Sequence, residues 1–343
     1  MKVSALPFLF LVTVTSVFGQ ISVEKINETF LYSIPPFKQC HASTLVELSD
    51  NSFLAAAFGG TREGNKDVAI WLSRYENNSW QEPTRVATGA SADGIVYPNW
   101  NPVLYKTTPT ELVLFYKTGP SPRAWWGMYK VSLDNGHTWG PPQRLPEGIL
   151  GPIKNKPVTL ANGTLLSPSS TETRTTEGLS WKVHIEKSID GGKHWVKIPI
   201  DPETPYDVIQ PSILVHSQDS LQILCRSRND AIMQSFSYDG GNTWSAISKT
   251  SLPNPNSGTD ALTLTNGTHL LVYNPLINGK DDRSKLNIAY SEDGNTWEDV
   301  YVLEDQTKGE YSYPAIIQDE DDNIHITYTY QRKNIKHLTF AIN

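Results

Sequence analysis

Two tyrosines, a histidine and two carboxylates are the residues whose chemistry could move protons or form a covalent bond. Tyr311 and Tyr313 lie two positions apart, and either hydroxyl could act as a nucleophile. A histidine side chain ordinarily titrates near neutral pH, so His41 is a candidate for proton transfer. Glu63 and Asp67 lie four residues apart in a glycine-containing segment, and each could serve as a general acid or base. Because these residues are spread over the chain, they can act together only if the fold joins its two ends.

A repeated motif predicts how the fold does this. Four segments share a serine, an aspartate, a glycine and a tryptophan at near-constant spacing, and a fifth copy lacks the aspartate. They are Ser132–Trp139, Ser188–Trp195, Ser237–Trp244, Ser291–Trp297 and the degenerate Ser73–Trp80. Their first residues are 49 to 59 positions apart, which is the length of one four-stranded propeller blade. In such an Asp box the aspartate binds backbone N–H groups, the glycine allows positive φ and the tryptophan packs between sheets, so we expect structural roles.

A second repeat predicts the innermost strand of each blade. Each copy begins with a polar residue, continues with proline or a small residue, and ends in apolar residues. The six first residues are His41, Asn101, Lys156, Gln210, Asp260 and Tyr313. Proline is tolerated in an edge strand, and the innermost strand of a blade is such an edge. We therefore expect these six side chains to meet at the mouth of a central channel.

The fold class that follows is all-β, a single six-bladed β-propeller of residues 20–343. Aromatic residues, glycine and proline are plentiful, and no long helical periodicity interrupts them. The segment from about residue 24 to 36 is expected to supply the outer strand of the last blade, so that the two ends of the chain close the ring. We see no second domain.

The predicted channel mouth is rich in cationic side chains, although the chain has a formal net charge of -7. The cations are Arg62, Lys154, Lys156, Arg226 and Arg283, and the anions are Glu63, Asp67, Asp260 and Glu310. The contrast suggests an anionic ligand, such as a sugar carboxylate held by arginines. The alternative is that these charges pair with one another structurally. Trp100, beside Asn101, is the tryptophan that we expect to stack on a sugar ring.

With these motifs the chain resembles the sialidase (neuraminidase) superfamily, in its Asp-box or BNR repeat branch, over residues 24–343. The resemblance implies that Arg226 and Arg283 are two of the three arginines that clamp a substrate carboxylate. It implies Asp67 as the acid/base, with Glu63 as a rival in the same loop. For the nucleophile, the local Tyr-Ser pair favours Tyr311, whereas the six-fold register favours Tyr313, which we prefer.

Two positions depart from the family pattern. His41 replaces the first clamp arginine, and Gln210 replaces the glutamate that primes the tyrosine. A glutamine cannot take the tyrosine proton, and a tyrosine that keeps its proton is a poor nucleophile at neutral pH. Either His41 replaces that base from across the channel, or the reaction is not that of sialidases.

The resemblance and the departures leave three functions open. The first is an exo-glycosidase that hydrolyses an acidic or acid-decorated glycan, using Tyr313 as nucleophile and Asp67 as acid, with weak activity on ordinary sialosides. The second is a uronate-specific polysaccharide lyase in which Arg226 and Arg283 neutralise the carboxylate while His41 and Tyr313 move protons. The third is a non-catalytic glycan-binding propeller.

The N-terminus and the sequons predict export. Residues 1–19 combine a lysine, an apolar run and a small-residue cleavage site, as in a signal peptide, and the run is too short for a membrane anchor. Four Asn-x-Ser/Thr sequons, at Asn27, Asn77, Asn162 and Asn266, fit a secreted glycoprotein. The last two are also Asn-Gly pairs, which a hairpin turn explains equally well.

The net charge, the cysteine count and the absence of metal and phosphate motifs argue against several classes of partner and cofactor. The acidic balance argues against nucleic acid and anionic membrane surfaces as partners. Cys40 and Cys225 are the only cysteines, so no disulfide framework holds the fold, and we favour two buried thiols over a pair. No metal-ligand spacing and no phosphate loop is present, so we expect no cofactor. We expect a monomer that binds a carboxylate-bearing glycan.

Overall fold

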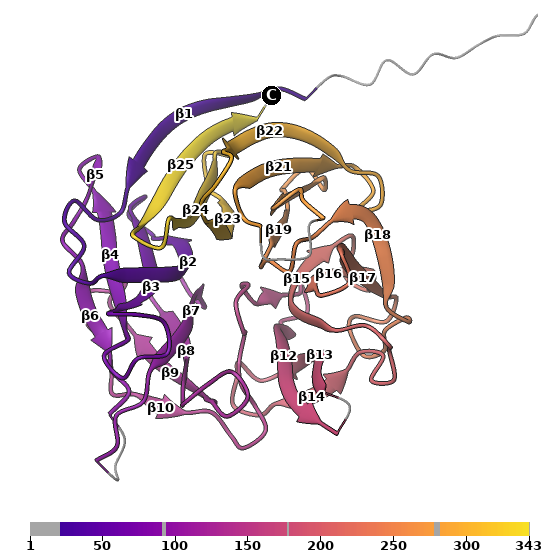
Figure 1. Cartoon of the computed structure of the whole chain (residues 1–343), viewed down its shortest axis with the longest axis horizontal. Coiled ribbons are helices and arrows are strands. Elements are labelled where there is room, and N and C mark those ends of the chain that lie inside the picture. The colour runs from indigo at the N-terminus through magenta and orange to yellow at the C-terminus, as the bar shows by residue number, and fades with distance from the viewer. Residues whose placement is uncertain (1–20, 91–93, 177, 278–281, 343) are drawn as a thin grey trace, which may run out of the picture.

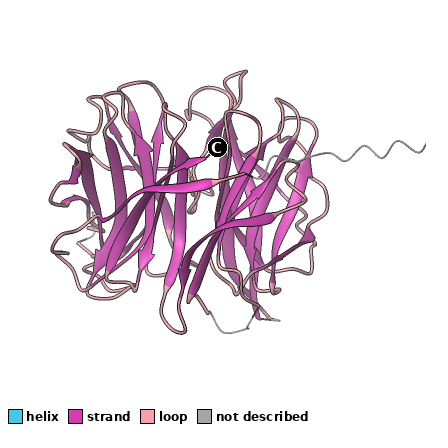
Figure 2. Cartoon of the chain, turned by 90° about the horizontal axis from the view of Figure 1, so that it is seen from above, coloured by secondary structure: helices cyan, strands magenta, loops and turns pink. Residues whose placement is uncertain are grey.

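Short β-strands joined by tight turns make up residues 21–90, 94–176, 178–277 and 282–342, which are the residues that this computed structural model describes. These residues contain no helix, and therefore none that could cross a membrane. The predicted signal peptide lies outside them. Six sheets stand around a central axis (Figure 1), and their strands run between two faces of the ring (Figure 2). The predicted six-bladed β-propeller is confirmed.

Each blade has its first strand nearest the axis and its later strands farther out. The strands of blades one to three are β2 (Gln39–Glu47), β3 (Phe53–Gly60), β4 (Ala69–Glu76), β5 (Ser79–Trp80) and β6 (Thr84–Ala87); β7 (Asn99–Lys106), β8 (Leu112–Thr118), β9 (Trp126–Ser132) and β10 (Gln143–Arg144); and β11 (Val158–Thr159), β12 (Leu165–Thr175), β13 (Gly178–Ser188) and β14 (Val196–Pro199). Those of blades four to six are β15 (Val208–Val215), β16 (Leu221–Ser227), β17 (Ala231–Ser237) and β18 (Ser248–Pro253); β19 (Asp260–Thr263), β20 (His269–Tyr273), β21 (Lys285–Ser291) and β22 (Glu298–Asp305); and β23 (Tyr311–Gln318), β24 (Ile324–Tyr330), β25 (Asn334–Ile342) and β1 (Val23–Phe30).

The two ends of the chain close the ring in the sixth blade. β1 pairs antiparallel with β25, from Val23 opposite Ile342 to Phe30 opposite Lys336. The predicted closure by the segment from residue 24 is therefore confirmed. It makes the first blade, with its loop of acidic residues, a direct neighbour of the last blade and its tyrosines.

The Asp boxes are structural, as predicted. In the fourth blade the Asp239 carboxylate accepts the N–H of Thr243 at 2.9 Å, and Gly241 has φ of 80°. The hydrogen bond from the Thr243 hydroxyl is the main reason that the pKa of Asp239 falls to about 2. Trp244 packs against the apolar cluster shared by the third and fourth blades. Each box thus ties an outer turn to the blade interface.

The innermost strands share a backbone irregularity that fixes their register. Four residues, Ala42, Asn101, Gln210 and Tyr313, have positive φ, and at each of them the ladder to the second strand skips two residues. The residue six positions after each of these begins a turn, in which its N–H donates to the carbonyl of the residue four positions later. In the first blade, for example, the N–H of Leu48 donates to the carbonyl of Ser52. The same turns at Leu160 and Leu264 identify Lys154 and Gly258 as the equivalents in blades three and five.

The predicted register is therefore right at Asn101, Gln210 and Tyr313 and wrong elsewhere. Ala42 takes the place predicted for His41, and Lys154 and Gly258 take the places predicted for Lys156 and Asp260. The reason is the β-bulge of the innermost strands. Its extra residues shift the pairing with the second strand, whereas the sequence prediction assumed a regular strand without a bulge. A Cβ at Gly258 would lie 2.9 Å from the side-chain ends of both Gln210 and Lys154, so a larger residue at this crowded position would have to displace these two side chains.

The cysteines and sequons can also be placed. Cys40 and Cys225 are free, buried thiols, as predicted, and burial raises the pKa of both. The four sequon asparagines, Asn27, Asn77, Asn162 and Asn266, are exposed. The Asn162 side chain accepts the N–H of Thr164, as in a turn, and Thr164 itself is buried.

We predict an acid-sensitive fold from its buried histidines. Burial is the main cause that lowers the pKa of five of them, to about 4 at His269 and about 3 at His337; the others are His41, His184 and His325. Below pH 6.5 the unfolded chain therefore binds protons that the folded chain does not, so stability must fall as the pH falls. Each such histidine contributes up to about 1.4 kcal/mol per pH unit.

The midpoint of urea denaturation should accordingly fall steadily between pH 6.5 and pH 5, before free carboxylates titrate. A His337→Gln variant should show a shallower fall than the parent. A midpoint that stays constant across this window would contradict the prediction.

Candidate functional site

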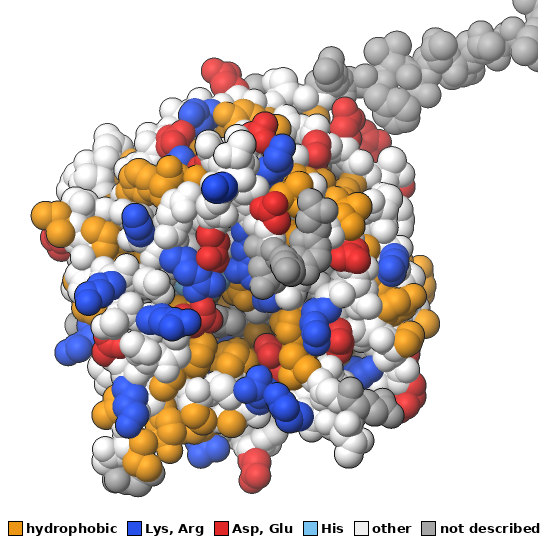
Figure 3. Space-filling view, viewed as in Figure 1, with side chains coloured by type: hydrophobic (Ala, Val, Ile, Leu, Met, Phe, Trp, Pro, Cys, Tyr) orange, Lys and Arg blue, Asp and Glu red, His pale blue; other side chains and the backbone are white. Residues whose placement is uncertain are grey.

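The candidate site lies at the mouth of the channel, on the face that contains the starts of the innermost strands. Because neighbouring strands are antiparallel, the second strand of each blade ends on this same face. Figure 3 shows basic and acidic side chains gathered around a hollow near the centre of the face. The positions that supply them are the innermost-strand bulges and the loops that follow the second strands.

Tyr313 is at the centre of the site. Its hydroxyl accepts a hydrogen bond from Arg226 Nη1 at 2.5 Å and another from Gln210 Nε2 at 3.2 Å. Arg226 Nη1 also faces Gln210 Oε1 at 3.4 Å, which fixes the orientation of the amide. Positive φ at Tyr313 turns its ring into the channel mouth, where 8% of the residue is exposed. Two donors therefore converge on one phenolic oxygen.

Tyr311 lies elsewhere, although residues two positions apart in a regular strand face the same side. The bulge between Ser312 and Ala315 breaks the alternation. Tyr311 joins the apolar cluster of blades five and six, and its hydroxyl accepts a hydrogen bond from Gln331 Nε2 at 2.5 Å. The structure thus brings Tyr313, and not Tyr311, to the predicted arginines.

Three cations surround the Tyr313 ring. The guanidinium carbons of Arg226 and Arg283 lie 5.7 and 5.5 Å from its centroid, and Lys154 Nζ lies 5.8 Å from it. Asn256 links the two arginines, because its side-chain oxygen accepts from Arg226 Nε and its carbonyl accepts from Arg283 Nη2. Both arginines lie where the sequence predicted them.

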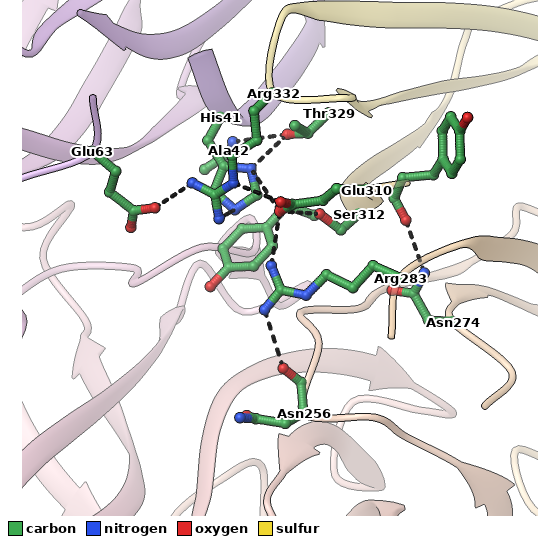
Figure 4. A network of polar contacts seen from close by, with 12 residues as sticks. His41, Ala42, Glu63, Asn256, Asn274, Arg283, Glu310, Ser312, Thr329 and Arg332 are labelled. Atoms are coloured by element: carbon green, nitrogen blue, oxygen red, sulfur yellow. Dashed lines mark hydrogen bonds and ion pairs between the residues drawn. The ribbon is translucent and has the colours of Figure 1, made fainter. Parts of the chain in front are cut away.

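A third arginine, Arg332, was missed by the sequence prediction. It comes from the hairpin between β24 and β25, and it reaches across blades (Figure 4). Its Nε donates to Glu310 Oε2 at 2.7 Å, Nη1 donates to Glu63, and Nη2 lies 3.5 Å from His41 Nε2. Arg226, Arg283 and Arg332 all lie at or after the end of a second strand, which is the signal that could have found it.

The arginines differ in how far their charge is already neutralised. Glu310 pairs with Arg283 at 3.0 Å and with Arg332 at 2.7 Å. Although burial alone would raise the pKa of Glu310, these two arginines hold it below its usual range, so Glu310 stays ionised. Among the described residues Arg226 forms no direct ion pair with a carboxylate. Of these three arginines, Arg226 is therefore the one best able to bind an anionic ligand.

His41 contacts the ring of Tyr313 and not its hydroxyl. The two ring centroids are 4.0 Å apart, and His41 Nδ1 lies 2.9 Å from Thr329 Oγ1. Because Arg332 can only donate, His41 Nε2 accepts and Nδ1 carries the hydrogen. Burial, followed by the charge of Arg332, lowers the pKa of His41 well below its usual value. His41 therefore supports Tyr313 as a neutral packing partner, and the geometry does not favour it as the base.

The loop of the first blade that contains Arg62, Glu63 and Asp67 contributes one residue to the site around Tyr313. Glu63 pairs with Arg332, whereas Arg62 is exposed. Asp67 is exposed and accepts the N–H of Thr61 at 2.8 Å, and hydrogen bonding by Thr61 lowers its pKa. A carboxyl group with a lowered pKa is ionised at neutral pH and is a weak proton donor.

The remaining predicted residues are bound within the ring. Lys156 and Asp260 form an ion pair at 3.0 Å, and Asp260 also accepts the N–H of Ile316 at 3.0 Å, which is the structural alternative that the sequence left open. Asn101 is buried at the bulge of β7. Trp100 is buried as well and packs against neighbouring aromatic rings, so it is not the open stacking surface that we predicted.

Lys154 is buried at the centre of the ring. Its ammonium donates to Pro314 O at 2.6 Å, to Thr259 O at 2.9 Å and to Asn155 Oδ1 at 2.7 Å. It thereby joins the third blade to the fifth and sixth across the channel, directly beside Tyr313. Burial lowers its pKa to about 7, and the Asp260 carboxylate opposes this.

A half-buried carboxylate that the sequence prediction did not include, that of Glu172, lies close enough to Arg226 for the two charges to interact. Glu172, near the end of β12, is the antiparallel partner of Trp181 on β13. The Arg226 guanidinium lies 5.2 Å from the centroid of the Trp181 ring. Burial raises the pKa of Glu172, although Arg226 opposes this. Within the described part of the chain, no group of three His, Cys, Asp or Glu side chains is arranged to hold a metal ion.

We predict that Lys154 is required for stability. A Lys154→Met substitution leaves three buried acceptors without a donor, so the free energy of unfolding should fall by about 3 kcal/mol. Urea denaturation measures this, with exposed Lys249→Met as the control that should change it by less than about 0.5 kcal/mol. A loss below about 1 kcal/mol for Lys154→Met would contradict the role assigned to its ammonium.

Comparison with known proteins places this site on a known fold. The sequence profile of the BNR repeat-like domain matches residues 51–326. A protein of unknown function from Dyadobacter fermentans has a similar structure over 94% of this chain and 100% of its own, with a TM-score of 0.76 and 15% identity. No curated protein matches the sequence.

Two sialidases have similar structures. The match to Trypanosoma rangeli sialidase covers 88% of this chain but only 55% of that protein, with a TM-score of 0.68 and 16% identity. The match to a variant of the NanB sialidase from Streptococcus pneumoniae covers 89% and 68%, with a TM-score of 0.66 and 13% identity. At these identities the likeness shows a shared fold and leaves the reaction open.

Proposed function

This chain belongs to the BNR repeat-like domain family, and from that premise we propose that it is a glycoside hydrolase that cleaves an acid-bearing sugar with Tyr313 as its nucleophile. The observation that carries the proposal is the convergence of Arg226 Nη1 and Gln210 Nε2 on the Tyr313 oxygen, at 2.5 and 3.2 Å. A hydroxyl that served only packing would not need two donors. Donors aimed at one oxygen stabilise negative charge as it develops there.

The two donors bear on the absence of a base for Tyr313, which follows from having Gln210 where the family has a glutamate. A glutamate at this position would accept the tyrosine proton, whereas Gln210 Nε2 donates to the oxygen that loses it. Besides Arg226, whose guanidinium carbon lies 5.7 Å from the centroid of the ring, Arg283 places a second positive charge 5.5 Å from it. Lys154 Nζ lies 5.8 Å from the same centroid, and burial lowers its pKa to about 7. In the proposed reaction this cationic setting replaces the missing base, and the proton of Tyr313 leaves to water.

Arg226 is also the basis for an acidic substrate. Glu310 pairs with both Arg283 and Arg332, and Glu63 pairs with Arg332 as well, whereas Arg226 forms no direct ion pair with a carboxylate among the described residues. Arginine binds carboxylates through parallel hydrogen bonds. With fewer free arginines than a three-arginine clamp needs, we expect low activity on ordinary sialosides. The proposal has the protein act outside the cell, which requires residues 1–19 to be cleaved.

The test is a panel of sialylated and uronate-containing glycans, followed by reducing-end release and by near-ultraviolet absorbance. Reducing sugar should appear without absorbance. Tyr313→Phe should lower kcat/KM by about 1,000-fold, because it removes the nucleophilic oxygen. Tyr311→Phe is the matched control and should stay within a few-fold of the parent, because that hydroxyl binds Gln331 instead.

Other outcomes would overturn the proposal in distinct ways. Absorbance from an unsaturated uronate would establish a lyase. Binding on a glycan array without any product would establish a glycan-binding propeller. Full activity of Tyr313→Phe would exclude Tyr313 as the nucleophile.

A further inference from the structure

A glycosidase needs a proton donor for the leaving group as well as a nucleophile, and the first-blade loop does not present a protonated carboxyl group. Asp67 is exposed and bound to its own loop, and Glu63 is paired with Arg332. Glu310 is held ionised between two arginines. The donor must therefore be sought on another blade.

Strand alternation orients Glu172 toward the site. Leu166, Ser170 and Glu172 share one face of β12, and Leu166 on that face packs in the apolar cluster shared with the fourth blade. The Ser170 hydroxyl accepts the N–H of Gln210 at 3.2 Å. Two residues along an extended strand span about 7 Å. Glu172 therefore projects from the same face, one step nearer the mouth than the residue that holds Gln210.

A second line of contacts reaches Glu172 from Tyr313. Arg226 Nη1 bonds the Tyr313 hydroxyl, and the same guanidinium lies over the Trp181 ring. Trp181 is the antiparallel partner of Glu172, so the two side chains lie next to each other on one face of the blade. The backbone N–H of Trp181 is fixed by Asp207 at 3.0 Å. Glu172 thus lies at the edge of the group of side chains that contains Tyr313 and Arg226.

We propose that Glu172 is the general acid and base of this site, an assignment that rests on the proposed glycosidase function. In the first step the Tyr313 oxygen forms a bond to the anomeric carbon and passes its proton to water. The glycosidic bond breaks, its electron pair goes to the leaving oxygen, and the Glu172 carboxyl proton goes to that same oxygen. In the second step water attacks the anomeric carbon and its proton goes to the Glu172 carboxylate. The bond between the anomeric carbon and the Tyr313 oxygen breaks, its electron pair stays on that oxygen, and the oxygen takes a proton back from water.

The electrostatic surroundings suit the first of these steps. Burial raises the pKa of Glu172 above its usual range, with Arg226, Arg123 and Arg228 opposing. In contrast, hydrogen bonding lowers the pKa of Asp67. A carboxyl group that keeps its proton closer to neutral pH is the better acid, so Glu172 suits this role better than Asp67 does.

The experiment compares Glu172→Gln with the parent on two substrates of the same sugar. One is a glycan, whose departure needs a proton, and the other is a dinitrophenyl glycoside, whose departure does not. For Glu172→Gln, kcat/KM should fall by about 1,000-fold on the glycan and by less than about 3-fold on the aryl glycoside. The basic limb of the pH profile on the glycan should disappear. Azide should restore turnover of the aryl glycoside by Glu172→Ala and yield the glycosyl azide.

Matched variants separate this role from a structural one and from its rivals. Exposed Glu203→Gln should leave both rates unchanged, and the thermal midpoint of Glu172→Gln should match the parent. Equal losses on both substrates, or no loss, would overturn the assignment. So would the same signature in Asp67→Asn or Glu63→Gln. If the parent cleaves no glycan and no aryl glycoside, the proposed function fails and the assignment fails with it, whereas an active parent with an unaffected Glu172→Gln refutes the assignment alone.

Discussion

The ammonium of Lys154 is the interaction on which the channel mouth depends. A propeller blade is held by apolar packing against its neighbours, and that packing does not fix the backbone at the axis, where the innermost strands do not pair with one another. Lys154 supplies the missing constraint by donating to carbonyls of Thr259 and Pro314, from blades five and six. Since Pro314 follows Tyr313 directly, the same bond fixes the backbone that aims the tyrosine. A buried cation is costly to desolvate, and its three acceptors offset that cost.

Around Tyr313, whose backbone Lys154 fixes, the other side chains of the site form ion pairs and hydrogen bonds with one another. Glu310 holds Arg283 and Arg332 on one side of Tyr313, and Asn256 holds Arg226 and Arg283 on the other. His41, in the place where the family resemblance implied an arginine, packs on the tyrosine ring without charge. Arg332 brings a guanidinium to the neighbourhood of His41 from the last blade. The site thus contains three arginines, but only Arg226 lacks a direct carboxylate partner within the described residues.

The architecture could be predicted from sequence because it depends on local chemistry that repeats. Each Asp box is a self-contained turn, and its spacing counts blades without knowledge of tertiary contacts. The register of the innermost strands could be predicted only in part, because each bulge adds residues. In the third blade the Lys156-Pro157 pair imitates the bulge motif two residues after the true position at Lys154.

The charged residues that the prediction missed share one physical cause. Arg332 and Glu172 lie near the ends of second strands, in segments without a repeated motif, and only the closed ring shows that these ends meet at the mouth. Whether a charge is free or paired depends equally on contacts between distant segments, as at Lys156 and Asp260, 104 residues apart. Such pairing is not encoded in any local pattern.

The central claim is that the Tyr313 oxygen attacks the substrate, and trapping the covalent intermediate tests it most directly. The protein would be incubated with a fluorinated derivative of the sugar that it releases, and its peptides analysed by mass spectrometry. The account predicts one adduct, on the peptide that contains Tyr313, formed in step with inactivation and absent in Tyr313→Phe. An adduct on another residue, or glycan cleavage with inversion at the anomeric carbon and no adduct, would contradict it.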